Sequence, residues 1–86
     1  MPTVSLFFGI KITMYFNDHQ PPHFHAQYAG KTAIINILDA TVMKSALPKR
    51  QLKLVLAWAE LHKDELMQSW ELVKESKTPL DIKPLS

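Results

Sequence analysis

Three of the four histidines, His19, His23 and His25, lie within the fourteen-residue stretch YFNDHQPPHFHAQY at positions 15–28. His23 and His25 are two positions apart, so on a β-strand both imidazoles leave the same face. Their Cβ atoms are then roughly 6–7 Å apart, as the rise of a strand dictates. One metal ion can bridge two imidazoles at that separation. His19 lies in the preceding turn and is predicted as the third ligand, with Asp18 as a candidate fourth.

Imidazole ligands suit zinc, copper, nickel and iron. The chain contains no cysteine, which excludes a thiolate zinc site. The first reading of the cluster is therefore a site for Zn²⁺ or another transition metal, held by His19, His23 and His25.

A second reading needs no metal, because two imidazoles can act as general base and general acid. Lys11 or Lys31 would then stabilise the charge that develops in the transition state, as in ribonuclease-type cleavage. This nuclease-like reading rests on an analogy of fold with small RNA-cleaving toxins.

A third reading treats the histidines as polar groups on the solvent-exposed face of a sheet, where they form a recognition surface. The polar and aromatic residues expected on that binding surface are Tyr15, Asp18, His19, His23, His25, Gln27 and Asn36.

The histidines must be positioned by strands, because apolar and polar residues alternate over residues 10–16, 23–28 and 31–38. Residues 3–8 also alternate and form either a short edge strand or an extended arm, and a further extended piece is predicted at 41–44. Ala29 and Gly30 make a two-residue turn, for which the glycine supplies a positive φ.

Register follows from keeping the apolar side chains on one face. It predicts the pairs Phe16–Phe24, Met14–Ala26, Ile12–Tyr28, Ala26–Ala33 and Phe24–Ile35. The expected sheet is a three-stranded antiparallel meander with one buried face, and its other face, which carries the histidines, is exposed to water.

A long helix is predicted over residues 48–76, because no glycine or proline follows Pro48 in that span. Its apolar stripe is expected to comprise Leu52, Val55, Ala59, Leu66, Trp70 and Val73. A straight helix of this length would reach roughly 43 Å, whereas a domain of this size is only about 30 Å across.

The helix is therefore expected to break at residues 61–64, with Asp64 capping a second helix and His62 as a structural histidine near the break. Residues 78–86 are expected to form an extended tail that Ile82 and Leu85 pin to the body. The predicted fold is α+β: one domain over residues 1–86, with the meander covered on one face by the broken helix.

Composition limits the classes of protein further. The 86 residues fit one domain, 47% hydrophobic content permits a core, and the net charge of +2 allows an anionic partner without indicating one. The N-terminus lacks a signal-peptide pattern and no apolar run reaches the length of a membrane span. Together with the absence of cysteine, this leads us to expect a cytoplasmic protein with no membrane partner and only weak support for nucleic-acid binding.

The stretch MYFNDHQPPHFHAQY, the segment LPKRQLKLVLAWAELHKDEL and the late Trp70 resemble the bacterial domain of unknown function 4160 family. The likeness runs over residues 8–85. Ser45 and Ala46 stand where such proteins usually carry a glycine. The resemblance implies a small cytoplasmic protein with no established activity, often encoded beside another short protein in the manner of toxin–antitoxin pairs.

The leading functional prediction is a small interaction or regulatory module, one half of a two-gene system, with a small protein partner or further copies of itself. A metal-binding protein and a metal-free nuclease-like enzyme are the two alternatives.

Overall fold

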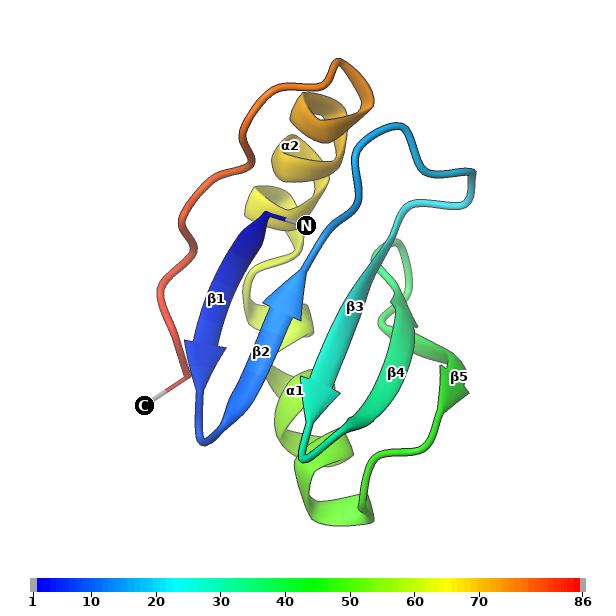
Figure 1. Ribbon diagram of the computed structural model, residues 1–86, viewed down its shortest axis with the longest axis vertical. Helices are drawn as coiled ribbons and strands as arrows, with labels where there is room; N and C mark the ends of the chain where they lie inside the picture. Colours follow the sequence, from blue (N-terminus) through cyan, green and yellow to red (C-terminus); the bar gives the residue numbers. More distant parts are fainter. Residues whose placement is uncertain (1, 86) are drawn as a thin grey trace.

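The computed structural model describes residues 2–85, which form five strands followed by two helices (Figure 1). The strands are β1 (Thr3–Phe7), β2 (Ile10–Thr13), β3 (His23–Tyr28), β4 (Lys31–Asn36) and β5 (Thr41–Ser45). The helices are α1 (Lys49–Leu61) and α2 (Lys63–Lys74).

The strands form one sheet in the order β1-β2-β3-β4-β5, and every neighbouring pair is antiparallel. The predicted α+β meander is confirmed in strands β2, β3 and β4. The segment predicted as an edge strand or an arm is the edge strand β1, and the extended piece predicted at residues 41–44 is β5. The sheet is therefore larger than the predicted three strands.

The predicted register is right on one side of β3 and wrong on the other. Phe24 lies opposite Ile35, as predicted, but Ile12 lies opposite Ala26 and not Tyr28. A shift of two residues keeps every side chain on its face, so the hydrophobic pattern cannot detect it. The strand was also predicted to extend to Phe16. Strand β2 in fact ends at Thr13, and Phe16 lies outside the sheet with 46% of its surface exposed.

Two tight turns set the geometry of the hairpins. Ala29 and Gly30 both have positive φ, at 49° and 79°, and so do Phe8 and Gly9 between β1 and β2, at 49° and 76°. Positive φ at both central residues is the pattern of a type I′ turn, whose twist matches that of the flanking strands. The predicted turn at Ala29 and Gly30 is thus confirmed.

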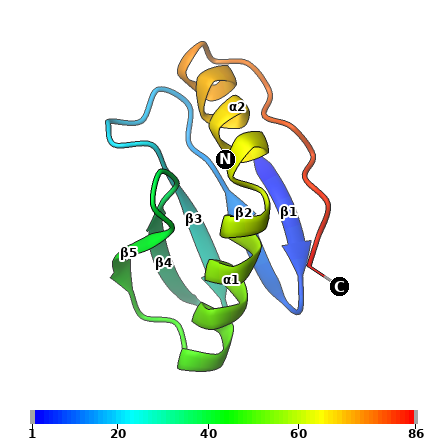
Figure 2. The ribbon, with the colours of Figure 1, turned by 180° about the vertical axis from the view of Figure 1, so that it is seen from behind.

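Both helices pack on one face of the sheet (Figures 1 and 2). Trp58 of α1 is fully buried and its ring lies edge-to-face on Phe24 of β3, with centroids 5.7 Å apart. Trp70 of α2 is also buried. The predicted stripe is confirmed, with Leu52 half-buried and the other members buried: Val55, Ala59, Leu66, Trp70 and Val73.

The predicted helix break is confirmed at His62, which separates α1 from α2. The longest dimension of the molecule is 33 Å, whereas an unbroken helix over 49–74 would measure about 39 Å. The predicted cap was wrong: His62 occupies the N-cap position and Asp64 lies in the first turn of α2. There its carboxylate complements the helix dipole instead. Within residues 2–85 neither helix has the length and apolarity needed to cross a membrane.

Of the predicted tail over 78–86, residues 78–85 contain no helix or strand and are held to the body, and residue 86 lies outside the described residues. The amide of Ile82 donates to the carbonyl of Val4 at 2.9 Å, and the indole Nε1 of Trp58 donates to the carbonyl of Lys83 at 2.9 Å. Ile82 is buried and Leu85 is half-buried against the core. The tail therefore runs beside β1 and covers that edge of the sheet (Figure 1).

Candidate metal centre

The loop between β2 and β3 is anchored to the end of α2. Asn17 has a positive φ of 54°, which asparagine tolerates better than most residues. Its amide donates to the carbonyl of Val73 at 3.1 Å, and its side-chain Nδ2 donates to Ser76 Oγ at 2.9 Å. These bonds hold the loop close to the helix end (Figure 1). Asp18, the next residue, is thereby positioned beside the start of β3.

Asp18, His23 and His25 bring three ligand atoms together, all within 4.8 Å of one another. Oδ2 of Asp18 lies 2.9 Å from Nε2 of His23 and 3.6 Å from Nε2 of His25. The first distance is a hydrogen bond and the second is too long for one. The carboxylate thus lies between the two imidazoles.

Both ring nitrogens of His23 face oxygen acceptors. Nδ1 lies 2.8 Å from the carbonyl oxygen of Pro21, and Nε2 lies 2.9 Å from Oδ2 of Asp18. A neutral imidazole has one N–H and can satisfy only one of these contacts. A second proton, or a cation between Nε2 and the carboxylate, would satisfy the other contact. In the second case the bond from Nδ1 to Pro21 resembles the outer hydrogen bond that usually orients a metal-binding histidine.

His25 has a buried nitrogen without a partner. Its Nε2 makes no hydrogen bond within the part of the chain that the structure describes. The ring of Tyr15 stacks on the imidazole, with centroids 4.2 Å apart and planes 26° apart. Burial lowers the pKa of His25 below its ordinary value, against the opposing pull of the Asp18 carboxylate. His25 is therefore held as a neutral imidazole, the form that binds metals.

Asp18 is held in its ionised form. Burial alone would raise the pKa of this carboxyl group, but the hydrogen bond from the amide of His19 and the proximity of His23 outweigh it, so the pKa lies below its ordinary value. The His19 amide donates to Oδ1 at 2.9 Å. Oδ2 is left to face the two imidazoles.

The predicted exposure of the histidines was wrong, because His23 and His25 are each only 8% exposed. Alternation along β3 does place them on the face opposite Phe24. What covers them comes from elsewhere in the chain: Tyr15 stacks on His25, and the ring of Trp70 lies 5.2 Å from that of His23. Periodicity identifies a face of a sheet and does not show whether a loop or helix folds over it.

The structure assembles only part of the predicted binding surface. His19 is exposed, and its ring does not belong to the group formed by Asp18, His23 and His25. Gln27 lies further along β3, opposite Lys11. Asn36 lies opposite His23, but its Oδ1 accepts a hydrogen bond from the amide of Leu38 in the next turn.

Two contributors were not predicted from the sequence. The carbonyl of Pro21 orients His23, and the indole of Trp70 was assigned to the core without its contact to that imidazole. The Pro-Pro pair next to His23 was the only signal for the first, and nothing in the sequence indicates the second. The predicted lysine Lys31 lies opposite Tyr28, at the far end of β3 from His23.

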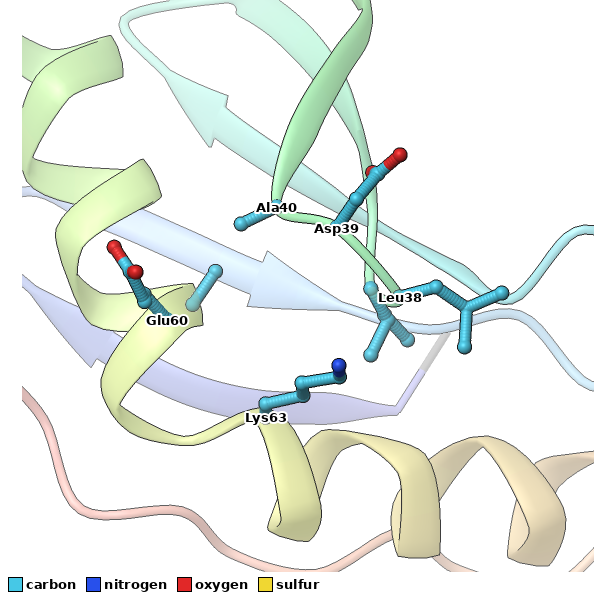
Figure 3. A pocket seen from close by; sticks show the side chains of 7 residues that line it. Leu38, Asp39, Ala40, Glu60 and Lys63 are labelled. Carbon is cyan, nitrogen blue, oxygen red and sulfur yellow. The ribbon is translucent and has the colours of Figure 1, made fainter.

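A separate cavity of about 130 Å³ lies between the β4–β5 turn and the helix junction (Figure 3). Its lining comprises Ile37, Leu38, Asp39, Ala40, Ala59, Glu60 and Lys63. Sites for small organic ligands usually measure about 300–1,000 Å³. The cavity is smaller, and the Oδ1 atom of Asp39 already accepts hydrogen bonds from Thr41. The histidine cluster is therefore the stronger candidate site.

A family model described as "Domain of unknown function (DUF4160)" matches residues 9–71, well over half of the chain. The chain belongs to the DUF4160 family. The matched span of this DUF4160 domain contains the complete Asp18, His23 and His25 cluster together with Tyr15 and Trp70. No curated protein and no solved structure shows a significant match. Family membership therefore identifies the domain and assigns it no activity.

Proposed function

We propose that the protein binds one divalent transition-metal ion through Oδ2 of Asp18, Nε2 of His23 and Nε2 of His25. The observation that carries the proposal is the buried Nε2 of His25, which has no hydrogen-bond partner and lies within 4.8 Å of the other two ligand atoms. Buried polar atoms are nearly always paired, so an unpaired one calls for an explanation. A bound cation supplies it.

The spacing of the ligand atoms is close to what such an ion needs. Zinc–nitrogen and zinc–oxygen bonds of about 2.0–2.2 Å at tetrahedral angles place neighbouring ligand atoms about 3.3–3.6 Å apart. The distance from Asp18 Oδ2 to Nε2 of His25, 3.6 Å, lies at the upper end of this range, and the distance to Nε2 of His23, 2.9 Å, would have to lengthen slightly. Two imidazoles and one carboxylate suit zinc and its first-row neighbours, and do not suit calcium or magnesium, which prefer oxygen ligands alone.

Each surrounding group has a definite part in this arrangement. The Pro21 carbonyl accepts from Nδ1 of His23 and so turns Nε2 toward the ion. The His19 amide fixes the Asp18 carboxylate, and the ring of Tyr15 shields His25 from water. Three protein ligands leave one position of a tetrahedral zinc ion for water, whose pKa the ion would lower.

Titration calorimetry of the tag-free protein with Zn²⁺, Ni²⁺ and Cu²⁺ tests the proposal. We expect one ion per chain, and we expect the Asp18→Asn and His25→Ala substitutions to weaken binding about 100-fold or more, at least the upper end of what loss of an outer-shell partner costs. His19→Ala is the matched control, because that histidine is exposed and outside the cluster. The metal affinity of the His19→Ala variant should equal that of the unmutated protein.

Two results would contradict the metal site. One is the absence of binding tighter than that of a free pair of imidazoles. The other is an equal loss of affinity in the His19→Ala and His25→Ala variants, since that pattern would indicate loose surface chelation. Circular dichroism of each variant establishes that the comparison is made between folded proteins.

A second proposed role is that of an interaction module, paired with the product of a neighbouring gene in the manner of toxin–antitoxin systems. The observation that favours it is the edge strand β5, whose five residues are all exposed. Co-expression with the neighbouring gene, with a tag on one product only, should yield a complex of fixed stoichiometry. Purification of the tagged product alone would argue against this role.

The metal-free nuclease reading has less support. A general acid–base pair needs imidazoles that can reach a substrate, and His23 and His25 are both buried. His23 also has both nitrogens engaged, with Pro21 and Asp18.

A further inference from the structure

The fold covers one edge of the sheet and leaves the other edge open. The edge formed by β1 is covered by the tail, through the hydrogen bond from Ile82 to Val4. The opposite edge, β5, has no strand on its outer side among residues 2–85. Figures 1 and 2 show β5 at the margin of the sheet, away from the tail. An open edge presents unpaired backbone N–H and C=O groups to any extended chain.

Two apolar side chains of this edge strand are exposed to solvent. Val42 is 40% exposed and Met43 is 46% exposed, and Leu38 in the preceding turn is 48% exposed. The register shifts between Ile34 and Ile35, so Met43 has no partner residue in β4. Proline, several charges, a β-bulge or a covering segment usually protects such an edge. On β5 this protection is limited to the bulge at Met43 and to one charged residue, Lys44.

Apart from Asp39, whose carboxylate accepts hydrogen bonds from Thr41 at the start of β5, the charge along β5 and the first turns of α1 is positive. Residues 41–59 include Lys44, Lys49, Arg50 and Lys53 and no acidic residue, although the whole chain has a net charge of only +2. All four of these side chains are exposed. The rest of the chain is therefore net acidic, and the positive charge is concentrated on β5 and the start of α1.

The positive charge of this segment distinguishes between three possible binding partners of the β5 edge. A second copy, paired antiparallel through β5, would bring two such basic segments together, and like charges across an interface are costly. A nucleic acid would match the charge but not the strand, since an edge of backbone donors and acceptors pairs with a peptide backbone. An acidic polypeptide would match both the positive charge and the backbone hydrogen-bonding groups of the edge.

We infer that β5 is a docking edge for an extended segment of a partner protein in which acidic and apolar residues alternate. The partner strand hydrogen-bonds to the free edge of β5, its apolar side chains cover Val42 and Met43, and its carboxylates face Lys44 and the basic start of α1. This inference rests on the second proposed role and is independent of the metal centre. Co-expression tests whether a partner protein binds at all, whereas a peptide probe tests whether β5 is the binding edge, so failure of the proposed role and failure of this inference give different results.

The probe is a capped, fluorescein-labelled peptide of nine residues in which glutamate and valine alternate. Fluorescence anisotropy with the full-length protein should show saturable binding with one peptide per chain. Amide chemical-shift changes in ¹⁵N-labelled protein should concentrate in residues 41–45. Lys44→Glu should weaken binding about fivefold, the effect of about 1 kcal/mol at an exposed charge pair. Lys77→Glu makes the same change in net charge outside the basic segment and should leave the affinity unchanged.

Two control peptides separate strand addition from simple charge attraction. The same peptide with alternate backbone nitrogens methylated keeps its charge and loses half of its donors, so it should not bind. A peptide of alternating lysine and valine should not bind either.

The inference is overturned if the methylated peptide binds equally well, if the chemical-shift changes map outside β5, or if no peptide binds at about 1 mM. It is also overturned if a ten-nucleotide oligouridylate binds β5 more tightly, or if sedimentation shows a dimer that Lys44→Glu dissociates or strengthens.

Discussion

Within the cluster, His25 is the residue that carries a buried polar atom without a hydrogen-bond partner. An unpaired polar atom in the interior costs about 1–3 kcal/mol, and the Nε2 atom of His25 is such an atom. A metal ion on Nε2 would remove this cost. Binding would also stabilise the fold by mass action, by about 4 kcal/mol when the free ion is at 1,000 times its dissociation constant. A bound ion would therefore link metal binding to the stability of the whole domain.

The lowered pKa of His25 predicts that the metal-free protein loses stability in mild acid. The unfolded chain takes up a proton near the ordinary histidine pKa of about 6.5, whereas folded His25 resists protonation. The unfolded state then binds more protons, so the unfolding free energy falls as the pH decreases below about 6.5. Urea melts in EDTA at pH 7.5 and pH 5.5 measure this loss, which should be smaller in the His25→Gln variant.

His19→Gln is the matched control substitution, because His19 is exposed and lies outside the cluster. Asp18 does not interfere, since its pKa lies below its ordinary value and the carboxylate is ionised in both states above pH 5. An equal pH dependence in the unmutated protein and the His25→Gln variant would show that His25 is not held neutral by burial.

At the scale of single residues, the sequence predicted the kinds of side chain in the cluster better than which residues form it. The spacing of His23 and His25 was sufficient to predict that both leave one face of a strand. It was not sufficient to rank Asp18 above His19, because that order depends on Asn17, whose bonds to Val73 and Ser76 fix the path of the loop. Contacts between residues almost 60 positions apart leave no trace in local spacing.

The elements were predicted where local chemistry determines them. The alternation in β3 and β4 and the turn between them are confirmed together with their register, because a two-residue turn fixes the pairing. The pairing of β2 with β3 has no tight turn to fix it, and there the prediction was two residues out. Register thus follows from turn geometry wherever the hydrophobic pattern allows more than one solution.

The turn at Ala29 predicts a stabilising substitution. Ala29 has a φ of 49°, in the left-handed region that costs an L-residue with a Cβ roughly 1–2 kcal/mol. Asparagine tolerates this region and precedes glycine in the preferred type I′ sequence. Ala29→Asn should therefore raise the unfolding free energy by about 0.5–1 kcal/mol in urea melts. Ala46→Asn serves as the control, since Ala46 is exposed and has no positive φ. A gain of equal size at Ala46 would contradict this explanation.

The whole molecule is held together by two tryptophans that join different parts of it. Trp58 connects α1 to Phe24 of the sheet and, through its Nε1, to the tail at Lys83. Trp70 connects α2 to His23. Their helical spacing was enough to predict that both are buried, but their partners were not predictable because the tail and the cluster reach them only in the folded chain. One indole thus supports the body, and the other supports the candidate metal centre.

The two indoles differ in one respect that a matched pair of substitutions can measure. Both are almost completely buried, but Nε1 of Trp58 donates to the Lys83 carbonyl, whereas Nε1 of Trp70 has no partner among the described residues. Trp58→Phe removes a hydrogen bond and leaves the carbonyl of Lys83 without its donor. Trp70→Phe removes an N–H whose burial is uncompensated. Trp58→Phe should therefore cost about 1–2 kcal/mol more than Trp70→Phe in urea melts.

The corresponding alanine variants control for the size of each ring. Trp58→Ala and Trp70→Ala should each cost about 3–5 kcal/mol, the usual loss for a large buried aromatic. The same melts with and without added Zn²⁺ separate the two roles, because only the Trp70 variants alter the wall against which His23 packs. The stabilisation by Zn²⁺ should then fall in the Trp70→Phe variant and persist in Trp58→Phe. If both phenylalanine variants lose the same stability and respond equally to Zn²⁺, Trp70 has no special connection to the cluster.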